Sequence, residues 1–259
     1  MLSLVLADSQ YMNPTLFQFA IAIPSFVLGS ALFIVLLCLY IKTEKARRLT
    51  LQIMALLLIT GEVAKILSYV YEYHYLPVDN IPMYLCSLFV VTFTINAFSA
   101  GRVSKFLLPF SFYGALFAGI AQLIQPYVLY NLLVGPESFS WIGIHSLFFH
   151  VILIVFSIQL VVWKYYKPTF LGTVKAISVI VVTGLIMIAV MEPIYSWMPS
   201  INFFELGRND SAFAGIFDII TYPVGVILYF IGIWAIFVAT WAGYKYIPKG
   251  FRAVFKKKQ

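Results

Sequence analysis

The stretch WIGIHSLFFHVILIVFSIQLVVW, residues 141–163, decides the class of this protein. It contains no Asp, Glu, Lys or Arg. At the rise of about 1.5 Å per residue of an α-helix, it is long enough to cross the hydrocarbon core of a bilayer, which is about 30 Å thick. Two histidines, His145 and His150, lie near its beginning. We therefore predict a membrane-spanning helix that carries polar side chains close to one end.

The composition extends this prediction to the whole chain. Of the 259 residues, 62% are hydrophobic and only 10% are charged, whereas a soluble globular domain has about 25% charged residues. The mean hydropathy of +0.95 agrees with this balance. A chain with so little polar surface cannot face water on all sides, so we predict an integral membrane protein that crosses the bilayer several times.

Further apolar segments of similar length precede and follow this stretch. The seven helices that we predict cover approximately residues 16–41, 49–73, 81–100, 106–124, 141–163, 170–190 and 218–244. No repeat or linker divides the chain, so we expect an all-α bundle in a single integral membrane domain, residues 1–259. In the fourth helix, Gly114 with Ala118 and Ala115 with Gly119 form two small-xxx-small pairs, which predict close packing against neighbouring helices.

The distribution of positive charge predicts the orientation. All of the 17 Lys and Arg residues except Lys65 and Arg208 lie in or beside the connections after the first, third and fifth predicted helices, or in the carboxyl-terminal tail. Because basic loops stay on the cytoplasmic side, we predict an outer amino terminus, an inner carboxyl terminus and seven crossings of the cell membrane. The net charge of +7 then reflects the orientation in the membrane and does not indicate an acidic partner. We expect membrane lipids and not nucleic acid as partners.

A thiol and two imidazoles are predicted at similar depth near the outer surface. Cys86 and His145 each lie about four residues inside a helix that begins on the outer side, and His150 lies roughly 7 Å deeper than His145. Residues five apart differ by about 140° around a helix axis, so the two histidines face different directions. This argues against a two-histidine metal site and favours separate roles. We expect neither a metal nor a cofactor.

The chemistry that a Cys–His pair performs is acyl transfer. An imidazole takes the thiol proton, the thiolate attacks an ester, and the thioester passes its acyl group to water or to a lipid hydroxyl. The alternative is structural, because cysteine is among the most buried residue types and a histidine on a helix is often hydrogen-bonded within a bundle. Cys38 and Cys86 are too few for a disulfide framework.

Glu62 and Lys65 lie near the middle of the second predicted helix. Ionisable residues at this depth are rare and usually functional. The two residues are three apart, so they share a helix face and can pair. They support an alternative function, a non-enzymatic binding or transport protein with a polar path at Glu62 and Lys65. A structural ion pair is an equally good interpretation of the same two residues.

Several short motifs, in order and spacing, resemble a known family. They are Pro82-Met83-Tyr84-Leu85-Cys86-Ser87 at a helix opening, Phe112-Tyr113-Gly114-Ala115 followed by Pro126, His145-Ser146-Leu147-Phe148-Phe149-His150, Asn202-Phe203-Phe204, and the acid Glu62. Together they cover about residues 49–225. This pattern resembles the YwaF-like integral membrane proteins of bacteria and the related animal transmembrane phospholipid acyltransferase.

The resemblance implies a reaction and roles for individual residues. It implies a thiol-dependent phospholipid acyltransferase that moves fatty acyl chains between lipids. Carried over to this sequence, Cys86 is the nucleophile and His150 or His145 is the general base. Glu62, Asn202 and Tyr84 are the candidates for polar support and contact with the substrate.

Overall fold

A computed structural model describes residues 23–74, 85–124, 141–194, 206 and 221–256. Within these ranges all regular secondary structure is α-helical. The helices are α3 (Ile23–Tyr40), α4 (Glu44–Tyr73), α5 (Leu85–Phe98), α6 (Arg102–Ile124), α8 (Trp141–Val162), α9 (Phe170–Met191) and α11 (Tyr222–Lys256). The structure therefore confirms the all-α class, and each of these helices coincides with one of the predicted segments.

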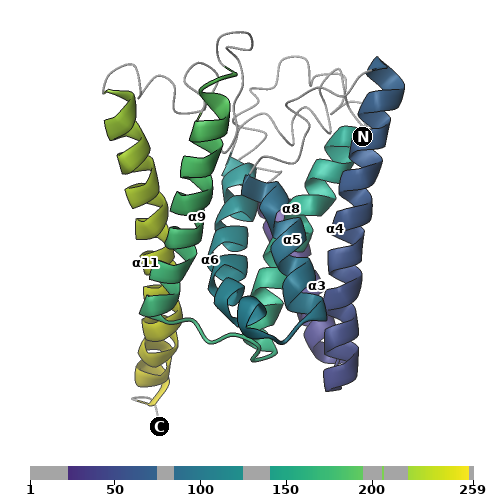
Figure 1. Ribbon diagram of the computed structural model, residues 1–259. Helices are drawn as coiled ribbons and strands as arrows, with labels where there is room; N and C mark the ends of the chain where they lie inside the picture. Colours follow the sequence, from purple (N-terminus) through teal and green to yellow (C-terminus); the bar gives the residue numbers. More distant parts are fainter. Residues whose placement is uncertain (1–22, 75–84, 125–140, 195–205, 207–220, 257–259) are drawn as a thin grey trace, which may run out of the picture.

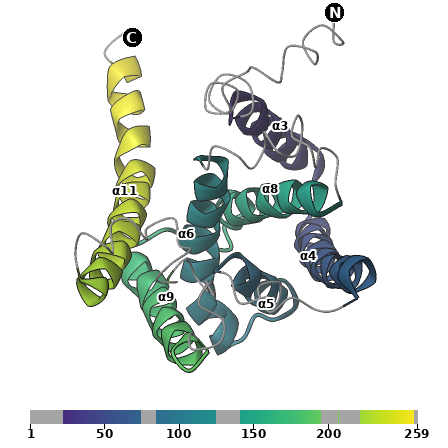
Figure 2. The same ribbon diagram turned by 90° about the horizontal axis from the view of Figure 1, so that it is seen from above.

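Helix α6 lies at the centre of the bundle (Figure 2). It packs against α5, α8, α9 and α11, while α4 contacts both α5 and α8. Helix α3 rests on the far side of α8, and α11 covers α9. The arrangement brings α4, α5 and α8 together on one side of α6, and these are the three helices that carry the predicted thiol, acid and histidines.

The surface of the bundle is apolar, as expected for a protein that lies in lipid. Helices α4, α6, α8, α9 and α11 are each long and apolar enough to cross a membrane, and α3 and α5 contain shorter apolar stretches, residues 28–40 and 86–98. Large apolar side chains such as Leu57, Val182 and Ile227 point outward and are more than half exposed. A membrane supplies the apolar surroundings that such side chains need.

Three of the helices extend further into basic stretches than we predicted. Helix α4 begins at Glu44, where we expected a basic loop, because the Thr43 hydroxyl oxygen accepts a hydrogen bond from the Ala46 amide at 3.2 Å and caps the helix. Helix α6 begins at Arg102, four residues early. Helix α11 continues through the predicted basic tail to Lys256. Lys and Arg are good helix formers, so basic stretches beside apolar ones extend helices.

The connections after α3, α5 and α8 all lie at one end of the bundle (the lower end in Figure 1). We call this the basic end. The described basic residues in these connections and in the adjoining helix turns are Lys42, Lys45, Arg47, Arg48, Arg102, Lys105, Lys164 and Lys167. At the opposite end lie the carboxyl terminus of α4 and the amino termini of α5 and α8 (Figure 1). Helices α5 and α8 therefore run in the same direction.

Small residues on α6 allow the close packing that the sequence predicts. Gly114, Ala115, Ala118 and Gly119 are all buried. A Cβ atom at Gly119 would lie 2.5 Å from Cγ1 of Ile154 on α8 and 3.3 Å from the backbone oxygen of His150. Only a residue without a side chain lets α6 approach α8 this closely, so Gly119 fixes the position of the helix turn that bears His150.

We predict that Gly119→Ala destabilises the bundle. Its added methyl group must displace Ile154, which costs about 1–3 kcal/mol of unfolding free energy. Gly232→Ala is the matched control, because a Cβ there meets no atom within 4 Å. Both variants gain the same helix propensity, so their difference isolates the packing contact. Unfolding of the full chain in detergent micelles measures it, and equal stability of the two variants would contradict the close α6–α8 contact.

Candidate functional site

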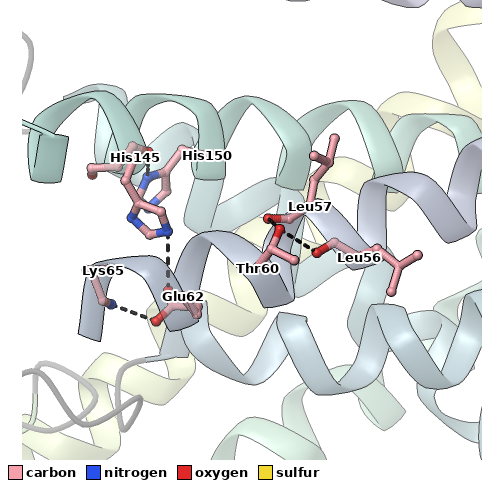
Figure 3. A network of polar contacts seen from close by, with 8 residues as sticks. Leu56, Leu57, Thr60, Glu62, Lys65, His145 and His150 are labelled. Atoms are coloured by element: carbon pink, nitrogen blue, oxygen red, sulfur yellow. Dashed lines mark hydrogen bonds and ion pairs between the residues drawn. The ribbon is translucent and has the colours of Figure 1, made fainter. Parts of the chain in front are cut away.

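The site is organised around a carboxylate buried in α4. Glu62 is only 7% exposed, and Lys65, one turn further along the same helix, places its Nζ 2.7 Å from Glu62 Oε2 (Figure 3). The pairing predicted from their three-residue spacing is therefore present. An unpaired carboxylate in a membrane interior is very costly, and the Lys65 ammonium supplies the counter-charge that such a group needs.

A histidine from α8 approaches the other oxygen of the same carboxylate. His145 Nε2 lies 3.9 Å from Glu62 Oε1 (Figure 3). The imidazole can lie this close to α4 because the residue beneath it is Gly61. A Cβ at position 61 would be 3.0 Å from Cδ2 and 3.1 Å from Nε2 of His145. Gly61 costs α4 roughly 1 kcal/mol of helix propensity relative to alanine, and in return it seats the imidazole against the helix.

The second histidine has a different partner. His150 is buried, and its Nδ1 lies 2.7 Å from the backbone oxygen of Ser146, one turn earlier on α8. A carbonyl oxygen can only accept, so Nδ1 donates this hydrogen bond and Nε2 carries the lone pair of the neutral ring. No described residue hydrogen-bonds to Nε2. His150 therefore offers a buried, oriented proton acceptor.

Phe149 connects the two imidazoles. Its ring centroid lies 5.6 Å from that of His145 and 5.5 Å from that of His150. Phe149 is itself buried, so it holds both rings in a water-poor environment. The two histidines thus share one aromatic neighbour. His150 is hydrogen-bonded to a backbone carbonyl, whereas His145 Nε2 lies near a carboxylate without a hydrogen bond to any described residue.

The other predicted site residues are placed only in part. Cys86 is the second residue of α5, half-buried and packed against the hydrophobic core. Tyr84 and Asn202 lie outside the described residues. Cys38, on α3 near the basic end, has its Sγ 3.9 Å from Oε1 of Gln159. In the described ranges no three His, Cys, Asp or Glu side chains come together as metal ligands would.

Sequence reasoning missed three features of this site. It did not identify Gly61 as the seat of an imidazole, Phe149 as the ring between the histidines, or the Ser146 carbonyl as the partner of His150. Only the first has a signal in the sequence, a glycine next to a mid-helix acid. The other two depend on side-chain rotamers, which spacing does not specify.

A double-mutant cycle tests the buried ion pair. Glu62→Leu leaves the Lys65 ammonium without its counter-charge, and we expect a loss of about 3 kcal/mol or more in unfolding free energy. Replacing both residues, as Glu62→Leu with Lys65→Leu, removes both charges and recovers most of that loss. Unfolding in detergent micelles measures all three variants. A double variant as unstable as the single one would show that the pair does not carry the stability of this region.

Comparison with known proteins identifies the family. No curated protein and no solved structure matches the chain. The sequence pattern of the TMEM164 family matches residues 12–252, which span nearly the whole chain and include every helix described above except the last turn of α11. The chain is thus a multipass membrane protein that belongs to the TMEM164 family.

Proposed function

We propose that this protein transfers fatty acyl chains between phospholipids, with Cys86 as the nucleophile and His150 as the general base. The observation that carries the proposal is the state of His150. Its Nδ1 is held by a backbone carbonyl, and its Nε2 is a buried proton acceptor with no hydrogen-bond partner among the described residues. A general base needs this combination of a fixed ring and an available lone pair.

Helix geometry supports the approach of Cys86 to the histidines. Phe93 of α5 and Phe156 of α8 stack with ring centroids 3.8 Å apart. Cys86 lies seven residues before Phe93 on α5, and Phe149 lies seven residues before Phe156 on α8. Seven residues are almost two full turns, so Cys86 lies on nearly the same face of α5 as Phe93, within about 20° and about 10 Å along the axis, and Phe149 is related to Phe156 in the same way on α8. Because α5 and α8 run in the same direction, Cys86 is expected to face Phe149, with a histidine on either side.

The reaction divides into two balanced half-reactions. His150 Nε2 takes the Sγ proton, the thiolate attacks the ester carbonyl of a donor phospholipid, and the glycerol oxygen leaves with that proton as a lysophospholipid. The acyl group stays on Cys86 as a thioester. The hydroxyl of an acceptor lysophospholipid then gives its proton to His150 and attacks the thioester, the C–S bond breaks, and the thiol is restored. Neither half-reaction changes an oxidation state, so lipids alone supply the reactants.

Glu62 and His145 are positioning residues in this proposal. The Glu62 carboxylate lies between Lys65 and His145, so it orients the His145 ring against α4 and thereby the shared neighbour Phe149. Asn202 and Tyr84, which the family resemblance suggested as polar support, stay proposed contacts of the substrate. The substrates enter from the lipid phase, because both the acyl donor and the acyl acceptor are membrane lipids.

The orientation of the protein follows from its charge in the same proposal. Basic connections stay in the cytoplasm, so the basic end faces inward and the site at the opposite end lies in the outer leaflet of the cell membrane. Seven crossings, with the amino terminus outside and the carboxyl terminus inside, satisfy this arrangement.

The packing of α4 favours this reading over a polar path for a transported solute. Between Glu62 and the basic end, the buried face of α4 consists of Leu51, Met54, Ala55 and Leu58. A solute or proton path through α4 needs polar groups along that face. The four apolar side chains instead separate the histidine site from water at the basic end, and the proposed reaction needs water to be excluded.

Trapping the acyl-enzyme tests the proposal. The full chain in lipid nanodiscs is supplied with phospholipid whose acyl chain carries an alkyne, quenched in acid and labelled. We expect hydroxylamine-labile label on the wild type, none on Cys86→Ala, and formation slowed about 10²–10⁴-fold in His150→Gln through loss of the base. Cys38→Ser is the matched control and keeps the label, since Cys38 lies near the other end of the bundle. Label that persists in Cys86→Ala would contradict a Cys86 thioester.

A further inference from the structure

A separate pocket opens at the basic end of the bundle. It has a volume of about 200 Å³ and lies among α4, α5, α6, the end of α8 and Tyr165 in the connection that follows. Its polar lining includes Arg48, Lys105, Ser104 and Asn96. Arg48 precedes Glu62 by 14 residues on α4, a separation of about 21 Å along the helix, so this pocket is distinct from the histidine site.

Two cations, Arg48 and Lys105, line this pocket. Neither Arg48 nor Lys105 makes a side-chain hydrogen bond or ion pair with a described residue, and the nearby acid, Glu44, instead accepts a hydrogen bond from the Tyr165 hydroxyl at 2.7 Å. Burial and this hydrogen bond raise the pKa of Tyr165 to about 12, so the hydroxyl keeps its proton at neutral pH. No Asp or Glu among the described residues lines the pocket, so its lining carries the positive charges of Arg48 and Lys105.

Two uncharged polar side chains of the pocket, Ser104 and Asn96, already form hydrogen bonds within the protein. Ser104 Oγ donates to Asn96 Oδ1 at 3.0 Å, and Asn96 Nδ2 lies 2.6 Å from Ser111 Oγ. This buried chain fixes the first turn of α6 against α5. The amino terminus of α6, a helix that begins at Arg102, adds its unpaired backbone N–H groups and positive dipole end beside Lys105. The cations and this helix end together favour an anion.

The rest of the pocket is apolar, and so are its surroundings. Leu51, Leu108 and Leu160 line its interior. On the adjoining ends of α5 and α6, Phe98 and Val103 are 49% and 62% exposed. A ligand that satisfies both the cations and these side chains combines a negative headgroup with apolar chains.

We propose that the basic-end pocket binds the phosphate of an anionic phospholipid headgroup, held by Arg48 and Lys105 and by the amino terminus of α6. The glycerol region rests on Leu51 and Leu108, and the acyl chains follow the exposed apolar side chains of α5 and α6. Arg48 makes the directional contact, because its guanidinium can bind two phosphate oxygens at once, whereas Lys105 acts as a point charge. The site does not depend on acyl transfer at the opposite end.

Lipid binding by native mass spectrometry tests this site. The full chain in detergent is titrated with phosphatidylglycerol, with phosphatidylcholine and, separately, with glycerol 3-phosphate. We expect preferential binding of phosphatidylglycerol, weakened about tenfold or more in Arg48→Gln and in Lys105→Gln. Lys45→Gln and Arg102→Gln are matched controls, because both are exposed cations of the basic end that do not line the pocket. They should bind as the wild type does.

A second variant fills the pocket without removing a charge. Ala100→Trp places an indole at an exposed residue of the pocket wall, and we expect it to block phosphatidylglycerol as the charge variants do. Equal losses in the pocket variants and the controls would overturn the site in favour of diffuse attraction. Equal binding of phosphatidylglycerol and phosphatidylcholine would overturn it as well. Glycerol 3-phosphate that competes at equal concentration would overturn the lipid as its ligand and assign the pocket to a soluble phosphate.

Discussion

A charge buried among membrane helices must have its counter-charge beside it, and Glu62 is where this constraint acts on the fold. Lys65 compensates the carboxylate from within α4, which leaves the other oxygen turned toward His145 of α8. The contact needs the bare backbone of Gly61, and the close approach of α6 to α8 needs Gly119. These contacts fix the depth and rotation of α8, and so the position of His150.

The two ends of the bundle have different chemistry. One end holds imidazoles, a thiol and a paired carboxylate in apolar surroundings, and the other holds two cations in the lining of an amphipathic pocket that no described acid lines. The apolar buried face of α4 between them keeps the two regions apart. The proposed acyl transfer and the proposed lipid site would use one end each, since the acyl ester and the headgroup phosphate of a lipid are different chemical targets.

The parts of this molecule that depend on composition and helical period could be predicted from its sequence. Every described helix was predicted from an apolar segment, and the ion pair of Glu62 and Lys65 was predicted from their three-residue spacing. Helix starts were mispredicted where Thr43 caps a basic stretch that reads as a loop. The partners of His145 and His150 could not be predicted, because they depend on which rotamer each ring adopts and on how near α4 lies to α8. The basic-end pocket also escaped prediction, since it is formed by helices distant in sequence.

The proposed acyl transfer requires Cys86 to face the part of α8 that carries both histidines. Phe149→Cys in a Cys38→Ser background places a second thiol on that turn, and Val151→Cys places one about 160° away around α8. Copper-phenanthroline oxidation of the membrane-embedded protein, followed by maleimide mass-tagging, counts the thiols that remain. We expect a disulfide between Cys86 and residue 149 and none with residue 151. Efficient cross-linking to residue 151, or none at residue 149, would contradict it.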